Sequence, residues 1–255
     1  MDSYTGFADV YDTLMDNIPY DEWVAYIFTL LKEHQVTTGT IVELGCGTGN
    51  ITKELAHKGY SMIGIDNSPD MLSFAKAKQT DKDPDILYLL QDMRKLHLEK
   101  PVDAVISICD SLNYMLGASD LTTVFQAVHQ CLCPMGIFIF DFKPLYFYKE
   151  ILSDHIFAED RDDVSLIWEN FFDEESHIHE YHLNIFKRKN KERSDFQKYQ
   201  EIHKQYAYTL KEIRECVKAS GLKWIAAYDA FTKKPPKRNS QRIYVIAEKS
   251  INRSS

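Results

Sequence analysis

The sequence predicts one α/β domain built on a largely parallel sheet, with an antiparallel β insertion after the fifth strand. From residue 40 onward, short apolar runs alternate with amphipathic stretches of helix length, as in parallel strands joined by crossover helices. After Asp141 this alternation gives way to longer extended segments in which aromatic and charged residues interleave. Because the alternation resumes near residue 210, we expect the insertion to interrupt a single domain.

The elements of the parallel region follow in chain order. Strands are predicted at residues 40–44, 61–65, 86–90, 102–108 and 137–142, and helices at residues 50–58, 68–78 and 121–131. Ser68 and Pro69 supply an N-cap and a proline at the first helical position for the second of these helices. Together these elements form about the first half of a nucleotide-binding sheet.

Further segments flank this region on both sides. Residues 20–34 carry apolar side chains at helical spacing, and the aromatic arm before them either covers a ligand or packs against the domain edge. Extended segments are predicted at residues 165–172, 177–186 and 195–206, then a helix at 210–219 and strands at 222–230 and 242–247. The predicted organisation is an N-terminal arm and helix at 1–35 that acts as a lid, an α/β domain at 36–145 and 207–250, and a β-rich insertion at 146–206 that covers an acceptor.

Composition narrows the class of partner. The formal net charge of −8 repels phosphate backbones, which disfavours nucleic acid and favours a small molecule. The five cysteines are scattered without a C-x-x-C pair or a secretory leader, so we expect a cytoplasmic location. No apolar run approaches the roughly 18 residues of a membrane span, and no feature indicates an oligomeric state.

The strongest functional signal is a glycine-rich run between the first predicted strand and its helix. Gly45, Gly47 and Gly49 follow the acidic strand residue Glu43 at alternate positions, which lets the backbone turn sharply and approach a ligand closely. Free amides at the start of the helix favour a carboxylate or a phosphate. The alternative, a tight turn without a ligand, fits three alternating glycines behind an acidic residue poorly.

Two acidic residues at later strand ends extend this signal to a nucleoside. Asp66 ends the second strand 21 residues after Gly45, where an acid accepts hydrogen bonds from ribose hydroxyls in this kind of fold. After the third strand, Asp92 is placed to accept from an adenine amino group, and Met93 to pack on the ring.

Four stretches resemble, in order, the motifs of class I methyltransferases dependent on S-adenosylmethionine: residues 43–49, 64–68, 91–93 and 103–107. The resemblance implies a Rossmann-like seven-stranded mixed sheet, S-adenosylmethionine as cofactor and S-adenosylhomocysteine as product. The segment at 210–247 is similar to the family's last helix and antiparallel strand pair, and the arm and insertion resemble a bacterial stand-alone branch. The predicted cofactor contacts are Tyr11, Glu43, Gly45, Cys46, Gly47, Gly49, Asp66, Asn67, Met71, Gln91, Asp92, Met93 and Cys109.

Two other functions compete with this interpretation. A nicotinamide-dependent oxidoreductase also uses a glycine loop and an acid after the second strand. The glycine pattern here is G-x-G-x-G, however, and none of the fifteen tyrosines is followed four positions later by lysine. A catalytically idle protein that binds an adenosyl ligand would carry the same motifs as an active enzyme.

The acceptor site is expected beyond the carboxyl ends of the strands. Asp110 and Asn113, after the fourth strand, either orient or deprotonate the acceptor or cap a turn, and both interpretations stay open. Sequences of the type Asn-Pro-Pro-Tyr are absent there, which disfavours planar amide or base nitrogens as acceptors. In and beside the insertion, the side chains that could face inward are Trp168, Tyr181, His203 and Tyr208, although packing between strands is the favoured role for most of them.

Histidines 177, 179 and 182 raise the question of a metal site. In a strand the first two share one face and the third points away, and they lack the H-E-x-x-H spacing of a helical site. Cys131 and Cys133 lie at a predicted helix end and are assigned to packing or to the surface. No metal is therefore predicted, and the histidines are assigned to a solvated face of the strand.

Overall fold

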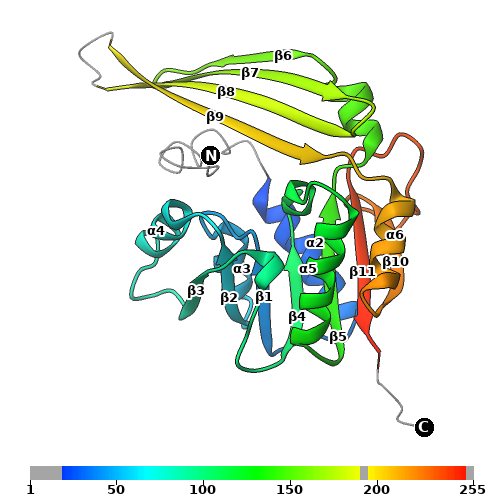
Figure 1. Ribbon diagram of the computed structural model, residues 1–255. Helices are drawn as coiled ribbons and strands as arrows, with labels where there is room; N and C mark the ends of the chain where they lie inside the picture. The colour runs from blue at the N-terminus through cyan, green and yellow to red at the C-terminus, as the bar shows by residue number, and fades with distance from the viewer. Residues whose placement is uncertain (1–18, 190–194, 251–255) are drawn as a thin grey trace.

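The computed structural model describes residues 19–189 and 195–250 and contains two sheets (Figure 1). A seven-stranded sheet flanked by helices forms the body, and a four-stranded sheet extends over one end of it. The mixed seven-stranded sheet and the antiparallel insertion after its fifth strand, both expected from the sequence, are confirmed.

The body sheet has the strand order of a doubly wound fold. Its strands lie side by side in the order β10 (Leu222–Asp229), β11 (Ile243–Lys249), β5 (Leu132–Phe142), β4 (Val102–Ser107), β1 (Thr40–Leu44), β2 (Ser61–Asp66) and β3 (Ile86–Leu90). Strand β11 runs antiparallel to both of its neighbours, and the other pairs are parallel. The order reverses beside β1, so the loops after β1 and β4 meet at the switch point where such sheets bind ligands.

Helices cover both faces of this sheet and bury two apolar cores. They are α2 (Tyr20–Glu33), α3 (Asn50–His57), α4 (Pro69–Ala77), α5 (Ala118–Cys131) and α6 (Leu210–Ala219). Along β5, Phe138 and Phe140 face the α5 side and pack around Phe125, while Ile137 and Ile139 face the α2 side. This two-residue alternation in a strand buried on both faces explains its continuous apolar sequence.

The four-stranded sheet, which we call the lid, consists of β6 (Ile156–Asp160), β7 (Val164–Asp173), β8 (Ile178–Arg188) and β9 (Phe196–Tyr206), each antiparallel to the next. A π-helical turn at Phe147–Leu152 precedes it. The sequence predicted three of these strands and missed β6, because all five of its residues are exposed at a sheet edge and show no alternation. Strand β8 begins one residue later than expected, since His177 has a φ of 58° and belongs to the preceding turn.

The two chain segments that connect the lid to the body lie side by side. Pro144 and Tyr208 form an isolated bridge, and the amide of Leu145 donates to the carbonyl of Tyr208 at 2.9 Å. The chain therefore leaves the body and returns to it at adjacent positions, which brings β9 over the carboxyl ends of the body strands (Figure 1). Among the helices of the described ranges, none combines the length and apolar character needed to cross a bilayer.

Candidate active site

A cavity of about 620 Å³ opens where the loops after β1, β2, β3 and β4 converge. Its volume lies within the range typical of small-molecule and cofactor sites. The predicted cofactor contacts that line it are Glu43, Gly45, Cys46, Gly47, Asp66, Asn67, Met71, Gln91, Asp92, Met93 and Cys109. Tyr11 lies outside the described residues, and Gly49 does not line the cavity. The structure thus gathers at one sheet edge residues that are spread over 67 positions of the sequence.

The three glycines after β1 have different environments. All have positive φ, at 71° for Gly45, 53° for Gly47 and 77° for Gly49. A Cβ at Gly45 would lie 2.6 Å from the hydroxyl of Ser111, and one at Gly49 would collide with Tyr88, whereas one at Gly47 would meet nothing within 4 Å. Gly45 and Gly49 therefore let the loop turn and pack closely against its neighbours, and Gly47 exposes its backbone to the cavity without a side chain.

Asp66 links this loop to the end of β2. One of its carboxylate oxygens accepts a hydrogen bond from the amide of Gly47 at 2.8 Å, and the other from the amide of Ser68 at 2.8 Å. Burial raises the pKa of Asp66, and these amide hydrogen bonds oppose the rise. Each oxygen can accept a further hydrogen bond, so the fixed carboxylate fits the pair of hydroxyls of a ribose. Ser68 caps α4 by accepting from the amide of Met71, as predicted.

Glu43 lies beneath the glycine loop and is almost fully buried. Burial raises its pKa to about 8, although the hydroxyl of Thr52 donates to the carboxyl group and opposes the rise. Glu43 therefore retains its proton at neutral pH.

This shift predicts how the stability of the protein depends on pH. Between about 4.5 and 8 the unfolded chain has released the Glu43 proton and the folded chain has not, so the free energy of unfolding falls as pH rises. Glu43→Gln keeps the shape and a partner for Thr52 but removes this titration. Urea denaturation across that window should show the variant gaining stability relative to the wild type as pH rises. A pH-independent difference between the two proteins would contradict the assignment.

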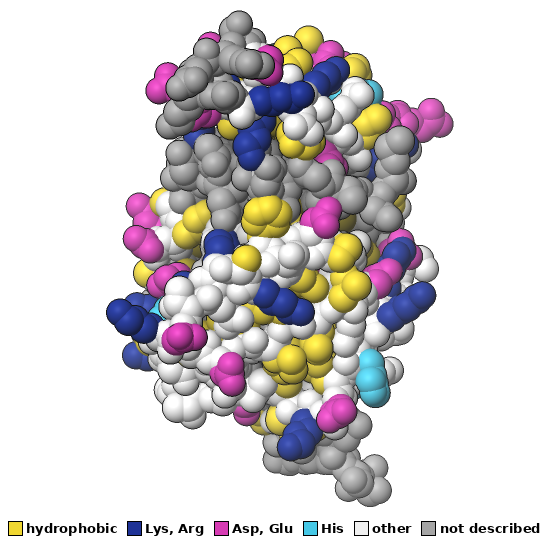
Figure 2. All heavy atoms as spheres, turned by 90° about the vertical axis from the view of Figure 1, so that its left-hand side faces the viewer, with side chains coloured by type: hydrophobic (Ala, Val, Ile, Leu, Met, Phe, Trp, Pro, Cys, Tyr) yellow, Lys and Arg dark blue, Asp and Glu magenta, His cyan; other side chains and the backbone are white. Residues whose placement is uncertain are grey.

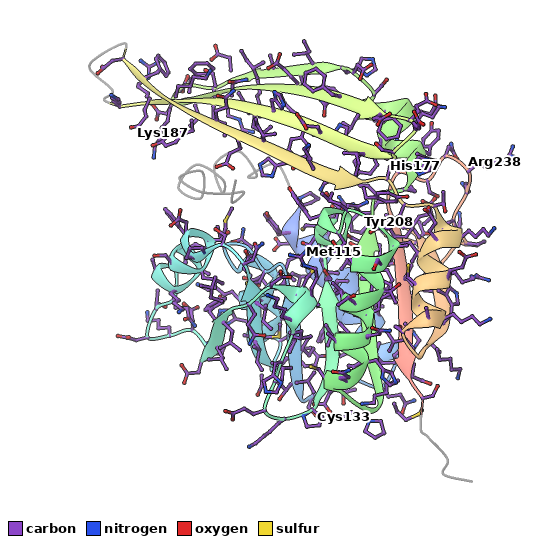
Figure 3. The ribbon with its side chains drawn as sticks, in the orientation of Figure 1. Met115, Cys133, His177, Lys187, Tyr208 and Arg238 are labelled. Carbon is purple, nitrogen blue, oxygen red and sulfur yellow. The ribbon has the colours of Figure 1, made fainter. Side chains whose placement is uncertain are left out.

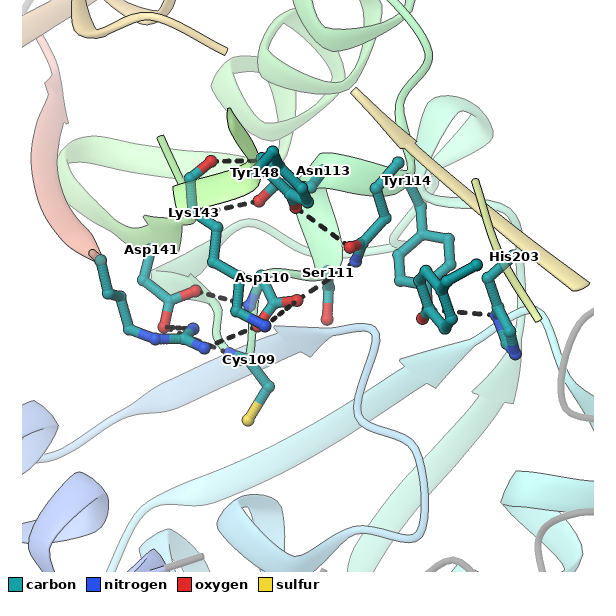
Figure 4. A network of polar contacts seen from close by, with 12 residues as sticks. Cys109, Asp110, Ser111, Asn113, Tyr114, Asp141, Lys143, Tyr148 and His203 are labelled. Carbon is teal, nitrogen blue, oxygen red and sulfur yellow. Dashed lines mark hydrogen bonds and ion pairs between the residues drawn. The ribbon is translucent and has the colours of Figure 1, made fainter. Parts of the chain in front are cut away.

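The loop after β4 lies on another side of the cavity and is held in an unusual conformation. Cys109 and Asp110 are consecutive non-glycine residues with φ values of 62° and 53°, a costly arrangement that needs support from its surroundings. The buried carboxylate of Asp141 provides it by accepting from the amide of Asp110 at 2.7 Å and from that of Cys109 at 3.3 Å. Arg242 in turn donates to both Asp141 and Asp110 at 2.7 Å (Figure 4).

Asp110 and Asn113, the two predicted catalytic candidates, do not line the cavity. The side-chain amide of Asn113 donates at 2.9 Å to the carbonyls of both Lys143 and Tyr206, and its oxygen accepts from the amide of Lys143. Asp110 accepts from Gln205 of β9 at 3.2 Å as well as from Arg242. These contacts favour anchoring roles between body and lid, and a catalytic role for either residue stays a prediction.

The loop after β3 also lines the cavity, but the sequence did not anticipate its ion pair. Arg94 pairs with the carboxylate of Asp92 at 2.6 Å, which lowers the pKa of that carboxyl and keeps it ionised. An adenine amino group at this position would share Asp92 with Arg94. Met93 packs against the core on the α5 side and reaches the cavity as predicted.

Several further lining residues were not among the predicted contacts. They are Tyr20, Thr48, Asn50, Ile51, Ile65, Arg94, Ile108, Ser111, Tyr114, Met115, Leu116, Asp120, Ile202 and Lys204. Ile202 and Lys204 belong to β9 of the lid and reach the cavity only because the chain returns over the body. Tyr114 carries a local signal, since it is an aromatic residue on the loop after the fourth strand, directly after the predicted candidate Asn113.

The four aromatic residues expected to face inward have different positions. Tyr181 and His203 meet Tyr114 at the contact between lid and body. Trp168 is partly buried within the lid, beside Tyr181. The expectation that Tyr208 faces inward from the insertion is wrong. Because the lid ends before Tyr208, this residue belongs to the body core, where its hydroxyl donates to the carbonyl of Met115 at 2.6 Å (Figure 3).

The histidines considered for a metal do not converge. His177 lies in a turn, and His182 pairs with Glu180 on the face opposite to His179. The expected solvated face is wrong for His179, which is buried because its side of β8 packs against Tyr148. Burial lowers the pKa of His179 to about 4, which keeps its ring neutral. Within residues 19–189 and 195–250, no group of three or more His, Cys, Asp or Glu side chains is arranged to hold a metal ion. Cys133 lies at the end of the body away from the lid (Figure 3).

The sequence and the fold of this chain are similar to those of known methyltransferases. Residues 41–136 match the family model described as a methyltransferase domain. The chain is 38% identical to the putative methyltransferase YqeM of Bacillus subtilis (strain 168), over 97% of each chain. It is 28% identical to an S-adenosylmethionine-dependent methyltransferase from Clostridium acetobutylicum ATCC 824, whose crystal structure superposes with a TM-score of 0.87 over 97% of this chain and 99% of that one. A Streptomyces fradiae dTDP-3-amino-3,6-dideoxy-alpha-D-glucopyranose N,N-dimethyltransferase is 23% identical over 61% of this chain and 60% of its own length.

Proposed function

The chain belongs to the class I S-adenosylmethionine-dependent methyltransferases, and within this family we propose that it methylates a small-molecule acceptor held between the cofactor loops and the lid. The observation that carries the proposal is the shared cavity. Its lining comes from the four strand-end loops of the body and also from Ile202 and Lys204 of β9. A cofactor on the loops and an acceptor under the lid would therefore occupy one space.

The residues of the cavity fit S-adenosylmethionine. Asp66 offers a fixed carboxylate to the ribose, Gly47 offers open backbone, and Asp92 and Met93 offer an acceptor and an apolar contact for the adenine. The bound cofactor supplies an electrophilic methyl group on its sulfonium. The protein's own contribution is then to orient the acceptor in line with that methyl group and to exclude water, which the cover provided by β9 supports.

Two observations favour a small acceptor over a nucleic acid. On the sheet domain visible in Figure 2, basic and acidic side chains are interspersed and do not form a continuous basic field, and the net charge is −8. The relative from Streptomyces fradiae acts, according to its name, on a nucleotide-linked amino sugar. Membership in the methyltransferase family sets aside the nicotinamide-dependent alternative.

The proposal predicts where a labelled methyl group goes. Purified protein is incubated with S-adenosylmethionine carrying a trideuterated methyl group and, in separate reactions, with a protein-free bacterial metabolite extract, bulk RNA and total protein. We expect mass spectrometry to find the label in the metabolite fraction. Label confined to RNA or protein would overturn the proposal, and binding of the cofactor without transfer in any reaction would favour the idle binding protein.

A further inference from the structure

We propose that Tyr114 contacts the methyl acceptor, that His203 and Tyr181 of the lid hold its hydroxyl in position, and that the accepting atom is an amine nitrogen. The inference rests on the proposed function, since it assumes an acceptor bound under the lid. Comparison with known proteins assigns no role to these three residues.

Tyr114 lies between the body loops and the lid strand that line the cavity. It ends the 3₁₀ turn η2 (Ser111–Tyr114), whose first residue contacts the glycine loop of the cofactor side, and its own side chain lines the cavity. Its hydroxyl oxygen lies 2.6 Å from the hydroxyl of Tyr181 and 3.2 Å from Nδ1 of His203. Tyr114 is thus a body residue in the cavity whose polar atom is held by the lid (Figure 4).

The two lid residues form a rigid support. Tyr181 of β8 and His203 of β9 are direct cross-strand partners, and their rings stack with centroids 4.8 Å apart and planes inclined by 10°. His203 is fully buried, while Tyr181 is partly buried and also packs against Trp168. A side chain held in this way loses little further freedom when it forms a catalytic contact.

The charge state of His203 sets the direction of these hydrogen bonds. Burial lowers its pKa to about 4, so the ring is neutral at physiological pH, with one donor and one acceptor nitrogen. Its Nε2 lies 3.8 Å from the carboxylate of Glu201, which favours the proton on Nε2. With this tautomer Nδ1 accepts the hydrogen of Tyr114, and the hydroxyl of Tyr181 donates to the Tyr114 oxygen. That oxygen keeps one further lone pair with which it can accept from a bound acceptor.

An amine fits this arrangement better than an alcohol. A hydroxyl acceptor must lose its proton to become a good nucleophile, and a histidine with a pKa of about 4 is too weak a base to remove it. A neutral amine already carries the lone pair, and its N–H can donate to Tyr114. Arg94 and Lys204 line the same cavity, but each is paired with a carboxylate, Asp92 and Glu180 respectively, so their charges do not distinguish an amine from an alcohol.

The transfer step then balances without an enzyme base. The nitrogen lone pair forms the new C–N bond while the C–S bond breaks. The electron pair of the C–S bond stays on sulfur, so the sulfonium becomes a neutral thioether. The nitrogen becomes an ammonium, which releases one proton to solvent. Tyr114 keeps its proton throughout and serves to orient the N–H, and therefore the lone pair, relative to the cofactor.

The test compares Tyr114→Phe, His203→Leu and His203→Asn with the wild type in the metabolite extract and trideuterated S-adenosylmethionine. Tyr199→Phe is the matched control, since it removes a hydroxyl from the same lid strand outside the cavity lining. Fragmentation of the product locates the labelled atom, and calorimetry measures affinity for S-adenosylmethionine. We expect label on nitrogen, a rate about 10–100-fold lower in Tyr114→Phe and His203→Leu, and unchanged cofactor affinity.

The conservative variant separates positioning from simple packing. Asparagine can place an amide oxygen near the position of Nδ1, so His203→Asn should recover part of the rate that His203→Leu loses. Label on oxygen, carbon or sulfur, equal rates in Tyr114→Phe and Tyr199→Phe, or a parallel loss of cofactor affinity would each overturn the inference and leave the proposed function intact. Absence of any labelled small molecule from a wild type that binds the cofactor would overturn both.

Discussion

Replacing Asp66 with alanine is expected to lower the affinity for S-adenosylmethionine by at least about a hundredfold. Hydrogen bonds to a charged group contribute about 1.5–3 kcal/mol each, and the carboxylate is positioned to accept from two ribose hydroxyls. The same carboxylate holds the amides of Gly47 and Ser68, so its loss also releases the glycine loop. Isothermal titration calorimetry of the variant against the wild type measures the effect.

An exposed aspartate provides the matched control for this experiment. Asp85 precedes β3 and lies outside the cavity lining, so Asp85→Ala should bind the cofactor as the wild type does. Thermal unfolding of both variants without ligand separates a binding defect from a folding defect. Wild-type affinity in a folded Asp66→Ala protein would mean that the nucleoside binds elsewhere.

Replacing Arg242 with methionine is expected to destabilise the protein by about 3–5 kcal/mol, the usual cost of leaving buried charges without their partner. Arg242 bridges Asp110 and Asp141, whose side chains are 13% and 0% exposed. Burial opposes the ionisation of both acids. The cations of Lys143 and Arg242 outweigh burial at Asp110 and lower its pKa, whereas the pKa of Asp141 stays raised. Urea denaturation at neutral pH measures the loss.

The dependence on pH identifies the cause of that loss. Without Arg242, burial and mutual repulsion raise the pKa of the two carboxyl groups in the folded state above their unfolded values, so the deficit should shrink as pH falls and grow as pH rises. Adding Asp141→Asn should recover part of the stability. Arg238→Met, in an exposed loop, is the matched control and should change stability by less than about 0.5 kcal/mol. A deficit independent of pH would indicate lost packing, for example against the ring of Trp23.

A hydrogen bond from the lid to Asp110 also connects the lid to these ion pairs and to the loop after β4. Gln205 of β9 accepts from the hydroxyl of Tyr148 at 3.0 Å and donates to Asp110, whose neighbours Cys109 and Ser111 line the cavity. The lid is therefore attached to the loop that borders the cofactor side by polar contacts as well as by the chain itself. Asp110 and Asn113 are therefore polar residues through which this loop contacts the lid.

The cofactor side of the site was predictable because its signals are local. Apolar runs of strand length mark β1 and β2, alternating glycines mark the loop between β1 and α3, and the position of Asp66 at a strand end requires only a count of residues. Parallel topology then brings the strand ends together without further information. Gly49 packs against Tyr88 and does not line the cavity. This contact joins two distant parts of the sequence, so the glycine pattern could not predict it.

The acceptor side was less predictable because its contacts are distant in sequence. Tyr114 and His203 are separated by 89 positions, and their hydrogen bond depends on the path by which the lid returns over the body. A polar residue in a turn looks the same in sequence whether it binds a substrate, as proposed for Asp110, or holds a backbone conformation. Strand β6 was missed for a related reason, since an exposed edge strand carries no burial pattern.

The most direct test of the account is a crystal structure of the protein with S-adenosylhomocysteine bound. We predict the ribose at Asp66, the adenine at Asp92 and Met93, and the sulfur on the side of the cavity that faces Tyr114. A nucleoside bound away from Asp66, or a sulfur directed away from Tyr114 and the lid, would contradict it.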